Sequence, residues 1–194
     1  MPRSARRVAR ISATVQRRLP DLTVVLENVH DPHNVSAVLR TCDAVGVLQA
    51  ELLYTIEKFP RIGKKSSSSA NKWVAHRRHT SVAACYARLR EEGFVVYATR
   101  LDPTARLLFD LDLTRKTAFV LGNEHRGVSD EAAAQADGLV VIPMRGMIES
   151  LNVSVAAGVC LYEALRQRLV RGLLSSPALP PAALASMLEE WLRK

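Results

Sequence analysis

The sequence predicts an α/β fold with a mainly parallel sheet and helices on both of its faces. Short runs of β-branched and apolar residues alternate with segments of helical periodicity, and this alternation is typical of βαβ units. Residues that start and stop helices stand between the runs. The chain has 194 residues, so it is long enough to bury a substantial core. We therefore expect one central domain with additions at both ends.

The first half of the chain carries clear start and stop signals. Pro20 ends an amphipathic, arginine-rich helix, because proline cannot continue the helical hydrogen bonding. Asp31 followed by Pro32 marks a helix start, with aspartate as the cap and proline at the first helical position. Gly46 stops that helix. The expected elements are a helix over 3–19, a strand over Leu22–Leu26, a helix from Pro32 to about Val45 and a strand over Leu48–Ile56.

The second half continues the alternation after a polar, basic stretch with four consecutive serines, which is typical of a loop. The expected elements are an extended segment at Trp73–Val74, a helix over Ser81–Glu92, a strand over Phe94–Thr99, a strand over Thr117–Leu121, a helix over Asp130–Asp137, a strand over Leu139–Ile142, a helix from about Asn152 to Arg171 and a final helix over Ala182–Lys194. Prolines interrupt the chain before the final helix and indicate a linker.

This pattern divides the chain into a basic N-terminal helix (1–20), a central domain (21–171) and a C-terminal helical extension (172–194). The two terminal helices lie outside the alternating pattern. Each has an apolar stripe that we expect to be exposed and to need a partner surface. A second subunit is one candidate for that surface.

The net charge of +8 favours an anionic partner. Nucleic acid ranks above a membrane, because basic residues interrupt every apolar stretch and no run approaches the roughly 18 apolar residues of a membrane span. The N-terminus has arginines but no apolar core, so a secretory signal is not expected. Cys42, Cys85 and Cys160 are odd in number and far apart, which indicates a cytoplasmic chain with reduced, mostly buried thiols.

Common nucleotide and metal motifs are absent from the sequence. No GxGxxG follows a strand, and the GxxxxG spacing of Gly122 and Gly127 has Val128 where a phosphate loop needs lysine. His30 and His33 straddle a proline, and no acid or cysteine cluster completes a metal-ligand set. NTP hydrolysis and metal binding are therefore disfavoured.

Three junctions remain, and in each a strand end is followed by polar residues and a helix. They are Glu27–Arg40, Leu121–Gly127 and Ile142–Asn152. Clefts in α/β proteins open at the carboxyl ends of strands, so these loops are expected to converge on one pocket.

Each junction also has a plain structural interpretation. Asn34 and Asn152 are suitable helix caps, and Glu124 is compatible with an ordinary loop acid. Arg40 is spaced to pair with Asp43 on the same helix, a solvated pair worth a few tenths of a kcal/mol. The combination of three such junctions favours a site over these separate explanations.

The residues of these junctions resemble a known family. The segments NVHDPHNVSAVLRTCDAVGV, FVLGNEHRGVSDEA and IPMRGMIESLNVSVAAGVCLYEA resemble the three motifs of the SPOUT superfamily of RNA ribose 2′-O-methyltransferases. The resemblance runs from about Leu22 to Arg168. The short length and the terminal helices look most like the subgroup that methylates the D-loop guanosine of tRNA at position 18.

The resemblance implies a deep trefoil knot in the C-terminal part of the sheet, an exception to the rule against threaded connections. It implies a homodimer that binds S-adenosylmethionine and takes RNA-contacting groups from both subunits. The implied cofactor-binding positions are Leu121, Gly122, Ile142, Met144, Gly146, Ser150 and Leu151. The implied catalytic and substrate-positioning residues are Asn34, Arg40, Glu124, Ser150 and Asn152.

The chemistry requires alignment of a 2′-hydroxyl with an activated methyl donor and loss of the hydroxyl proton. Arg40 is the family's candidate base, yet neutral guanidine at pH 7 lies roughly five pKa units, or about 7 kcal/mol, uphill. Anchoring a phosphate and polarising the hydroxyl is the less costly role. Asn34, Ser150 and Asn152 are expected to orient the hydroxyl or the donor, and Glu124 to fix loop geometry or contact the partner subunit.

RNA binding has separate support from clusters of basic residues, which give salt-dependent phosphate contacts. The predicted RNA-binding residues are Arg3, Arg6, Arg7, Arg10, Lys64, Lys65 and Lys72. Lys58, Arg61, Arg77 and Arg78 belong to the same basic region around the serines. A solvated basic surface is the structural alternative. Trp73 and Phe59 are suited to base stacking, although core packing is favoured for Trp73.

The sequence thus predicts a dimeric, knotted tRNA 2′-O-methyltransferase without a membrane span, located in the cytoplasm. Alternatives are a wobble-position or ribosomal RNA methyltransferase, or a non-catalytic RNA-binding protein of the same fold. The joint presence of Asn34, Arg40 and Asn152 argues against the last.

Overall fold

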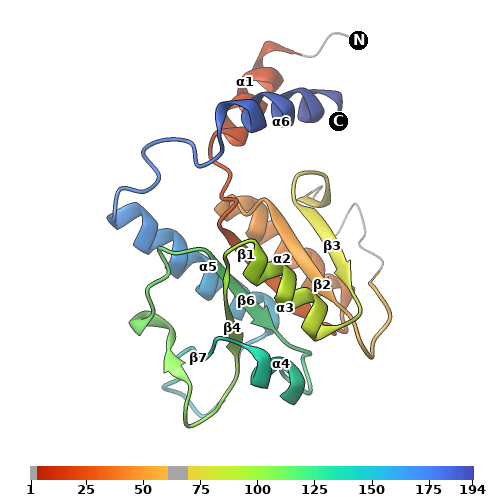
Figure 1. Ribbon diagram of the computed structural model, residues 1–194, viewed down its shortest axis with the longest axis vertical. Helices are drawn as coiled ribbons and strands as arrows, with labels where there is room; N and C mark the ends of the chain where they lie inside the picture. Colours follow the sequence, from red (N-terminus) through yellow and green to blue (C-terminus); the bar gives the residue numbers. More distant parts are fainter. Residues whose placement is uncertain (1–3, 61–69) are drawn as a thin grey trace.

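The computed structural model describes residues 4–60 and 70–194, and its centre is a seven-stranded sheet in which all paired strands are parallel (Figure 1). The strand order is β3-β2-β1-β6-β4-β7-β5. The strands are β1 (Leu22–Glu27), β2 (Gln49–Leu53), β3 (Ala75–His79), β4 (Val95–Thr99), β5 (Arg106–Leu107), β6 (Thr117–Leu121) and β7 (Gly138–Val141). The predicted α/β class is confirmed, and the sheet is wholly parallel.

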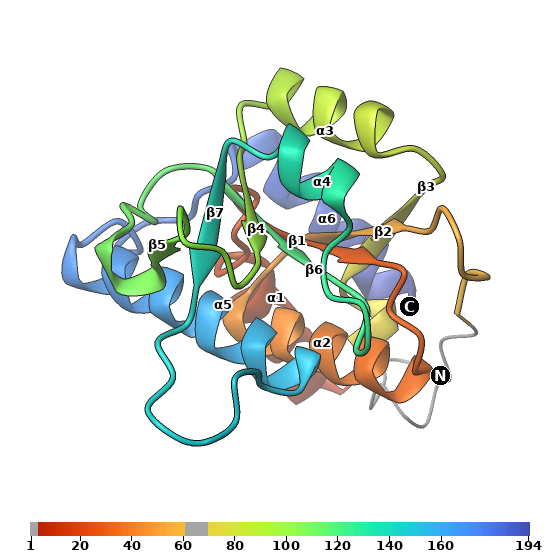
Figure 2. The same cartoon turned by 90° about the horizontal axis from the view of Figure 1, so that it is seen from below.

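Helices cover both faces of the sheet (Figure 2). The hydrophobic core splits accordingly, with α2 and α5 packed on one face and α3 and α4 on the other. The helices are α1 (Ala5–Val15), α2 (Pro32–Val45), α3 (Val82–Glu91), α4 (Asp130–Gln135), α5 (Val153–Val170) and α6 (Pro181–Arg193), with short 3-10 turns η1 (Ala70–Lys72) and η2 (Leu108–Asp110).

The central strand β1 shows why the sheet is buried on both faces. All six of its residues are buried. Val24 and Leu26 belong to the core under α2 and α5, and Val25 to the core under α3 and α4. A continuous apolar run without alternation is the pattern expected of a parallel strand covered on both sides.

The predicted boundaries of α2 are confirmed by its caps. The Asp31 carboxylate accepts a hydrogen bond from the backbone N–H of His33 at 2.8 Å, with Pro32 at the first helical position. Gly46 ends the helix with φ +100°, and a Cβ there would lie 2.7 Å from the backbone oxygen of Arg17. Only glycine fits both the left-handed conformation and this close approach.

Two edge strands were not predicted. The extended segment expected at Trp73–Val74 is replaced by η1 and then β3, and the sequence indicated neither β5 nor η2. The reason is that edge strands pack on fewer neighbours. β3 has the polar sequence AHRRH and β5 has only two residues, so neither carries the apolar signal of a central strand. The strand expected over Leu48–Ile56 is also shorter, at Gln49–Leu53.

The terminal helices α1 and α6 pack against each other, which corrects the expectation that both apolar stripes are exposed (Figure 1). Ile11 and Val15 of α1 form a small core with Trp191 of α6. The Trp73 ring lies 4.8 Å from the Trp191 ring, which confirms that Trp73 packs in a core. The helices thus cover part of each other's apolar faces within one chain, while Leu184, Met187 and Leu188 of α6 stay half-buried.

Arg18 anchors this helix pair to the central domain. Its side chain is 1% exposed, and its guanidinium lies 4.8 Å from the centre of the Trp191 ring. It donates to the Asp43 carboxylate at 2.6 Å and to the backbone oxygen of Trp73 at 3.1 Å. The alternative pairing of Asp43 with Arg40 is therefore wrong, because Arg18 holds Asp43.

The three cysteines are free and buried, as predicted. Burial raises the pKa of each thiol to about 12, so the reactive thiolate is scarce at neutral pH. None of the helices in the described part of the chain combines the length and apolar character that crossing a bilayer requires.

Candidate functional site

The three predicted junctions lie at the carboxyl ends of β1, β6 and β7, and their side chains meet. The Asn34 side-chain N–H donates to the Glu124 carboxylate at 2.8 Å. The Asn152 side-chain N–H donates to the Asn34 amide oxygen at 3.1 Å. One polar chain therefore links all three junctions across sequence separations of 90 and 118 residues.

Each link is fixed by the local structure. Asn34 lies in the first turn of α2, whose cap is Asp31, so capping is not its role. Asn152 caps α5, with its side-chain oxygen accepting from the backbone N–H of Ser154 at 2.9 Å. Its amide nitrogen remains directed at Asn34. The structural interpretation is thus correct for Asn152, but it does not exclude the site.

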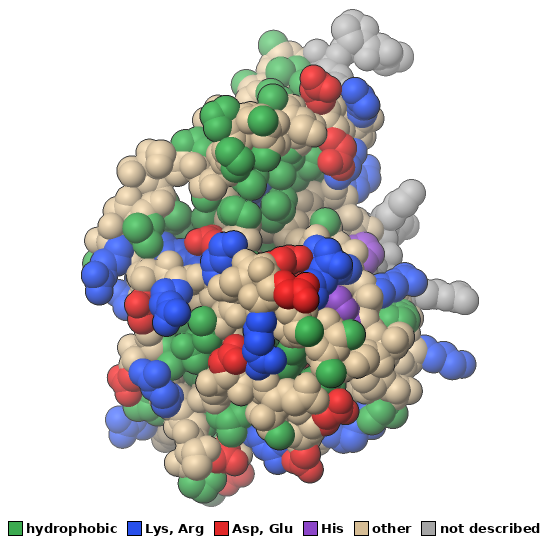
Figure 3. Space-filling model, in the orientation of Figure 1, with side chains coloured by type: hydrophobic (Ala, Val, Ile, Leu, Met, Phe, Trp, Pro, Cys, Tyr) green, Lys and Arg blue, Asp and Glu red, His purple; other side chains and the backbone are tan. Residues whose placement is uncertain are grey.

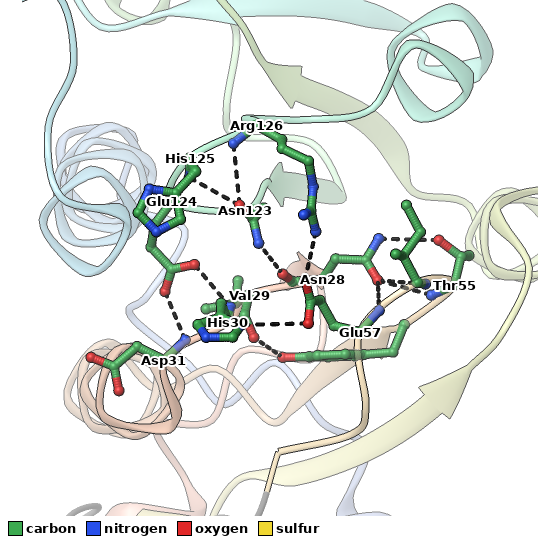
Figure 4. A network of polar contacts seen from close by, with 12 residues as sticks. Asn28, Val29, His30, Asp31, Thr55, Glu57, Asn123, Glu124, His125 and Arg126 are labelled. Carbon is green, nitrogen blue, oxygen red and sulfur yellow. Dashed lines mark hydrogen bonds and ion pairs between the residues drawn. The ribbon is translucent and has the colours of Figure 1, made fainter.

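Glu124 is the charged end of this chain, and Figure 4 shows its carboxylate beside His30 and Asp31. Its carboxylate also accepts from the backbone N–H groups of His30 at 2.8 Å and Asp31 at 3.1 Å. Partial burial raises its pKa, but the hydrogen bonds from Asn34, His30 and Asp31 outweigh burial and leave the pKa below its ordinary value. The carboxylate is therefore ionised at neutral pH and accepts three hydrogen bonds, which makes it an anchor for the loops and a poor proton acceptor.

Two asparagines that were not predicted as site residues bind the backbone of the loops next to Glu124. Asn28 follows β1 with φ +49°, and its side-chain oxygen accepts from three backbone N–H groups, those of residues 55–57. The Asn123 side chain donates to the backbone oxygen of Asn28 at 2.8 Å and accepts from the backbone N–H groups of His125 and Arg126. An asparagine just past the end of each strand was the available signal, since asparagine side chains bond the backbone of turns, and at Asn28 the residue also tolerates the left-handed region.

An ion pair between Arg126 and Glu57 joins this network to the loop after β2 (Figure 4). Arg126 lies 2.7 Å from the Glu57 carboxylate, and the His30 ring lies 3.4 Å from its other oxygen. The hydrogen bond from Arg126, followed by that from His30, lowers the pKa of Glu57. The loops after β1, β2 and β6 are therefore tied together at one edge of the sheet.

Arg40 and Ser150 are not brought into the polar chain. Arg40 is exposed on α2, about a third of a turn (~120°) around the helix axis from Asn34. It makes no hydrogen bond or ion pair with any residue the structure describes. Ser150 is exposed in the loop before α5, and within the described ranges it too has no hydrogen-bond partner. Both side chains are available to a ligand or to another chain.

The predicted cofactor-binding residues border the same region. Leu121 is buried at the end of β6, and Ile142 packs against the core just after β7. The remaining positions lie on one irregular loop that is partly or fully exposed; they are Met144, Gly146, Ser150 and Leu151. Figure 2 shows this loop as a wide excursion between β7 and α5.

Position 122 has no room for a side chain. A Cβ at Gly122 would lie 2.1 Å from the backbone of Gly127, because the two ends of the Asn123–Gly127 turn approach closely and form a bridge. Any side chain at Gly122 would open this turn. The glycine spacing that resembled a phosphate loop is thus a tight turn that positions Glu124.

The predicted RNA-binding arginines lie on the outer surface of the terminal helix pair. Arg6, Arg7 and Arg10 are exposed on α1 and line a groove of about 540 Å³ whose floor includes Trp73 and Trp191. Figure 3 shows hydrophobic side chains gathered at the surface over the terminal helices. The groove combines cations with aromatic rings.

The basic residues of the serine-rich region have mixed outcomes. Lys72 is exposed on η1, and its backbone oxygen accepts from the Lys194 ammonium at 2.8 Å. Arg77 forms an ion pair with Glu92 at 3.0 Å, so it serves the packing of α3 and is not part of a free basic surface. Lys58 and Arg78 are exposed. Four further predicted residues lie outside the described ranges; they are Arg3, Arg61, Lys64 and Lys65.

Comparison with known proteins identifies relatives along the whole chain. A tRNA (guanosine(18)-2′-O)-methyltransferase of Thermus thermophilus is 50% identical over 192 residues, 99% of this chain and 98% of the relative. The crystal structure of the A. aeolicus TrmH/SpoU tRNA modifying enzyme is 38% identical with a TM-score of 0.89, covering 96% of this chain and 94% of that one.

A third relative was solved with a ligand. The SpoU methyltransferase AviRb from Streptomyces viridochromogenes, in complex with the cofactor AdoMet, is 27% identical with a TM-score of 0.69. The match covers 79% of this chain and 58% of that chain. Residues 21–162 match the model of the SpoU rRNA Methylase family. That match covers the sheet, the three junctions and the polar chain, and it confirms the resemblance: the protein belongs to the SpoU methylase family.

Proposed function

We propose that the protein transfers a methyl group from S-adenosylmethionine to the ribose 2′-hydroxyl of the D-loop guanosine at position 18 of tRNA. The observation that carries this proposal is the Glu124–Asn34–Asn152 chain, which joins the three family motifs in one place. The full-length similarity to the Thermus methyltransferase supports the substrate. The cytoplasm, where tRNA is processed, is the corresponding location.

The loop after β7 fits the methyl donor. Within the described chain, residues 142–151 make no backbone–backbone hydrogen bond, so their N–H and C=O groups are free to bind the edge of an adenine ring. Leu121 and Ile142 supply an apolar border. The cofactor, when bound, supplies an activated methyl group on a sulfonium centre.

The amides of Asn34 and Asn152 position the acceptor hydroxyl. Each side-chain NH2 group has two donors, of which the described contacts use one, so each retains an N–H for a ribose oxygen. Glu124 fixes the direction of both amides, because it accepts from Asn34 and thereby turns the Asn34 oxygen toward Asn152. The chain therefore orients the nucleophile without taking its proton.

Arg40 supplies positive charge. Its guanidinium is exposed and unpaired among the described residues, which suits contact with the phosphate beside the target ribose. A guanidinium there stabilises the developing alkoxide electrostatically. Ser150 is free to hold the donor or the hydroxyl, and the exposed arginines of α1 bind the tRNA backbone.

The C-terminal part of the chain is proposed to form a trefoil knot. β7 lies between β4 and β5 in the sheet, although β5 follows β4 directly in the chain. The Gln167 side chain of α5 then bonds the backbone of Leu111 and Leu113, and Arg168 bonds the backbone of Leu113 and Arg115. These contacts support passage of α5 through the loop between β4 and β6.

The protein is proposed to act as a homodimer. One face of α5 is buried against α2 and the sheet, while Val155, Tyr162 and Leu169 are 50%, 52% and 59% exposed. A seven-residue spacing puts these three on a single stripe. A second copy of the chain would cover this stripe and bring its own Arg40 and basic surface toward the site.

The test is methyl transfer from labelled S-adenosylmethionine to unmodified tRNA transcripts, with the product position mapped. We expect label at guanosine 18 and none in a transcript with 2′-deoxyguanosine there. Label at the wobble nucleotide or only on ribosomal RNA would replace the substrate assignment. Cofactor and RNA binding without transfer to any RNA would favour a non-catalytic binding protein.

A further inference from the structure

The edge strand β3 directs its two arginines to opposite faces of the sheet. Arg77 and His79 face α3, since Arg77 pairs with Glu92 and His79 lies 2.6 Å from Glu51. Arg78 lies on the other face, where its guanidinium is 5.0 Å from the centre of the Phe59 ring. The alternation of a strand thus separates a structural arginine from an exposed one.

The Arg78 side chain packs over two aromatic rings that contact each other. Its guanidinium covers the Phe59 ring, which packs against the Tyr54 ring at 5.2 Å between centres. Tyr54 is 3% exposed, and its hydroxyl donates to the backbone oxygen of Val29 at 2.9 Å. The buried end of this stack is therefore fixed, and the exposed end is a flat guanidinium.

Stacking of this kind leaves the guanidinium free to bind. A cation–π contact uses the flat face of the group and none of its five N–H donors. Arg78 is exposed and has no hydrogen bond or ion pair with residues 4–60 or 70–194. Glu57, two residues before Phe59 in the chain, is itself paired with Arg126 at 2.7 Å. An immobilised, unpaired guanidinium loses less entropy when it binds an anion.

The stack adjoins the candidate site. Val29, which receives the Tyr54 hydroxyl, precedes His30, whose backbone N–H donates to Glu124 at 2.8 Å. His76 is exposed on the same face of β3 as Arg78. Figure 3 shows Lys, Arg and His side chains together on the side of the molecule that carries β3. A substrate strand reaching Glu124 would therefore pass close to Arg78.

We propose that Arg78, held flat on Phe59, binds one phosphate of the RNA substrate beside the candidate site. The inference rests on the proposed function for the identity of the RNA. The fork of guanidinium donors matches a phosphate in a bidentate manner, whereas Lys in its place would present only a point charge. The contact positions the backbone and carries no sequence information.

The test measures tRNA binding to the full-length protein against salt concentration. Arg78→Ala is expected to raise Kd about tenfold near 0.15 M salt. It is also expected to lower the slope of log Kd against log salt by about 0.7–0.9, the value of one phosphate contact. Phe59→Leu keeps the charge but removes the ring face, so it should raise Kd only a few-fold with an unchanged slope.

Arg88→Ala is the matched control, because it removes an equal charge from α3 on the opposite face of the sheet. Arg78→Ala values of Kd and slope equal to those of Arg88→Ala would overturn the proposal. The two proposals fail separately. If the wild type binds tRNA with a steeper salt dependence than Arg78→Ala but methylates no tRNA, the proposed function is wrong and the phosphate contact is supported. If the wild type methylates guanosine 18 while Arg78→Ala binds normally, only the contact is wrong.

Discussion

The carboxylate of Glu124 illustrates how hydrogen-bond donors select a chemical role at the scale of the residue. Three N–H groups point at it, two from the backbone and one from Asn34. These donors keep it ionised and leave it little capacity to accept a substrate proton. Its contribution is therefore to geometry: it sets the orientation of Asn34, and through Asn34 that of Asn152.

The first prediction follows from the lowered pKa of Glu124. A carboxylate with a depressed folded-state pKa stabilises the fold fully above its unfolded pKa of about 4.5, and this contribution is lost as pH falls through the folded value. Glu124→Gln should reduce the free energy of unfolding by about 1–2 kcal/mol at pH 7. The difference from wild type should shrink as pH falls from about 5 to 3.

Urea unfolding at a series of pH values measures this difference. Glu131→Gln is the control, since Glu131 is an exposed carboxylate on α4 whose one partner among the described residues is Gln135. It should leave stability nearly unchanged. A Glu124→Gln deficit that stays constant down to pH 3 would show that the ionised carboxylate is not the stabilising species.

The second prediction concerns Arg40. Arg40→Ala should nearly abolish turnover at saturating tRNA, because the reaction loses its charge at the ribose phosphate, and it should leave Tm unchanged, because the side chain is exposed and unpaired in the described structure. Steady-state kinetics and thermal melting are the measurements. Arg17→Ala, an exposed arginine just after α1, controls for net charge. Retention of most of kcat would remove Arg40 from the mechanism.

At the scale of elements, the central strands and helix caps could be predicted because their signals are local. The apolar run of β1 and the Asp31-Pro32 start of α2 stand in consecutive residues. The edge strands β3 and β5 could not, since their pairing depends on strands that supply the apolar contacts. The packing of α1 on α6 could not be predicted either, because it joins residues at opposite ends of the chain.

The third prediction tests that helix pair. Trp191 is 4% exposed and contacts both Trp73 and Arg18. Trp191→Ala should detach α6, since truncation of a buried tryptophan costs about 3–5 kcal/mol, while the central domain stays folded. Limited proteolysis should then cut the linker before Pro181 much faster. Glu189→Ala, a change at an exposed position of the same helix, should leave the rate of cutting unchanged. Equally fast cutting of both variants would refute the role of Trp191.

At the scale of the whole molecule, some residues of the candidate site are linked to one another within the chain and others are not. The polar chain of Asn34, Glu124 and Asn152 is assembled within one chain. The family motifs predicted its members, but the hydrogen bonds between them depend on the fold. Arg40 and Ser150 are exposed, and no contact within the described structure fixes their side chains, so both are free to meet another surface. A second copy docked on α5 is the surface that the exposed stripe favours.

The last prediction therefore concerns assembly. Tyr162 is 52% exposed at the centre of the apolar stripe on α5, between Val155 and Leu169. Tyr162→Asp puts a charge where a dimer would bury it, and an unpaired buried charge is strongly unfavourable. Light scattering after size-exclusion chromatography should show a wild-type dimer and a folded monomeric variant with little methyl transfer. The control is Ala84→Asp, at an exposed position of α3 on the opposite face of the sheet, and this variant should remain a dimer. A wild type that is monomeric and fully active would mean that one chain completes the site alone.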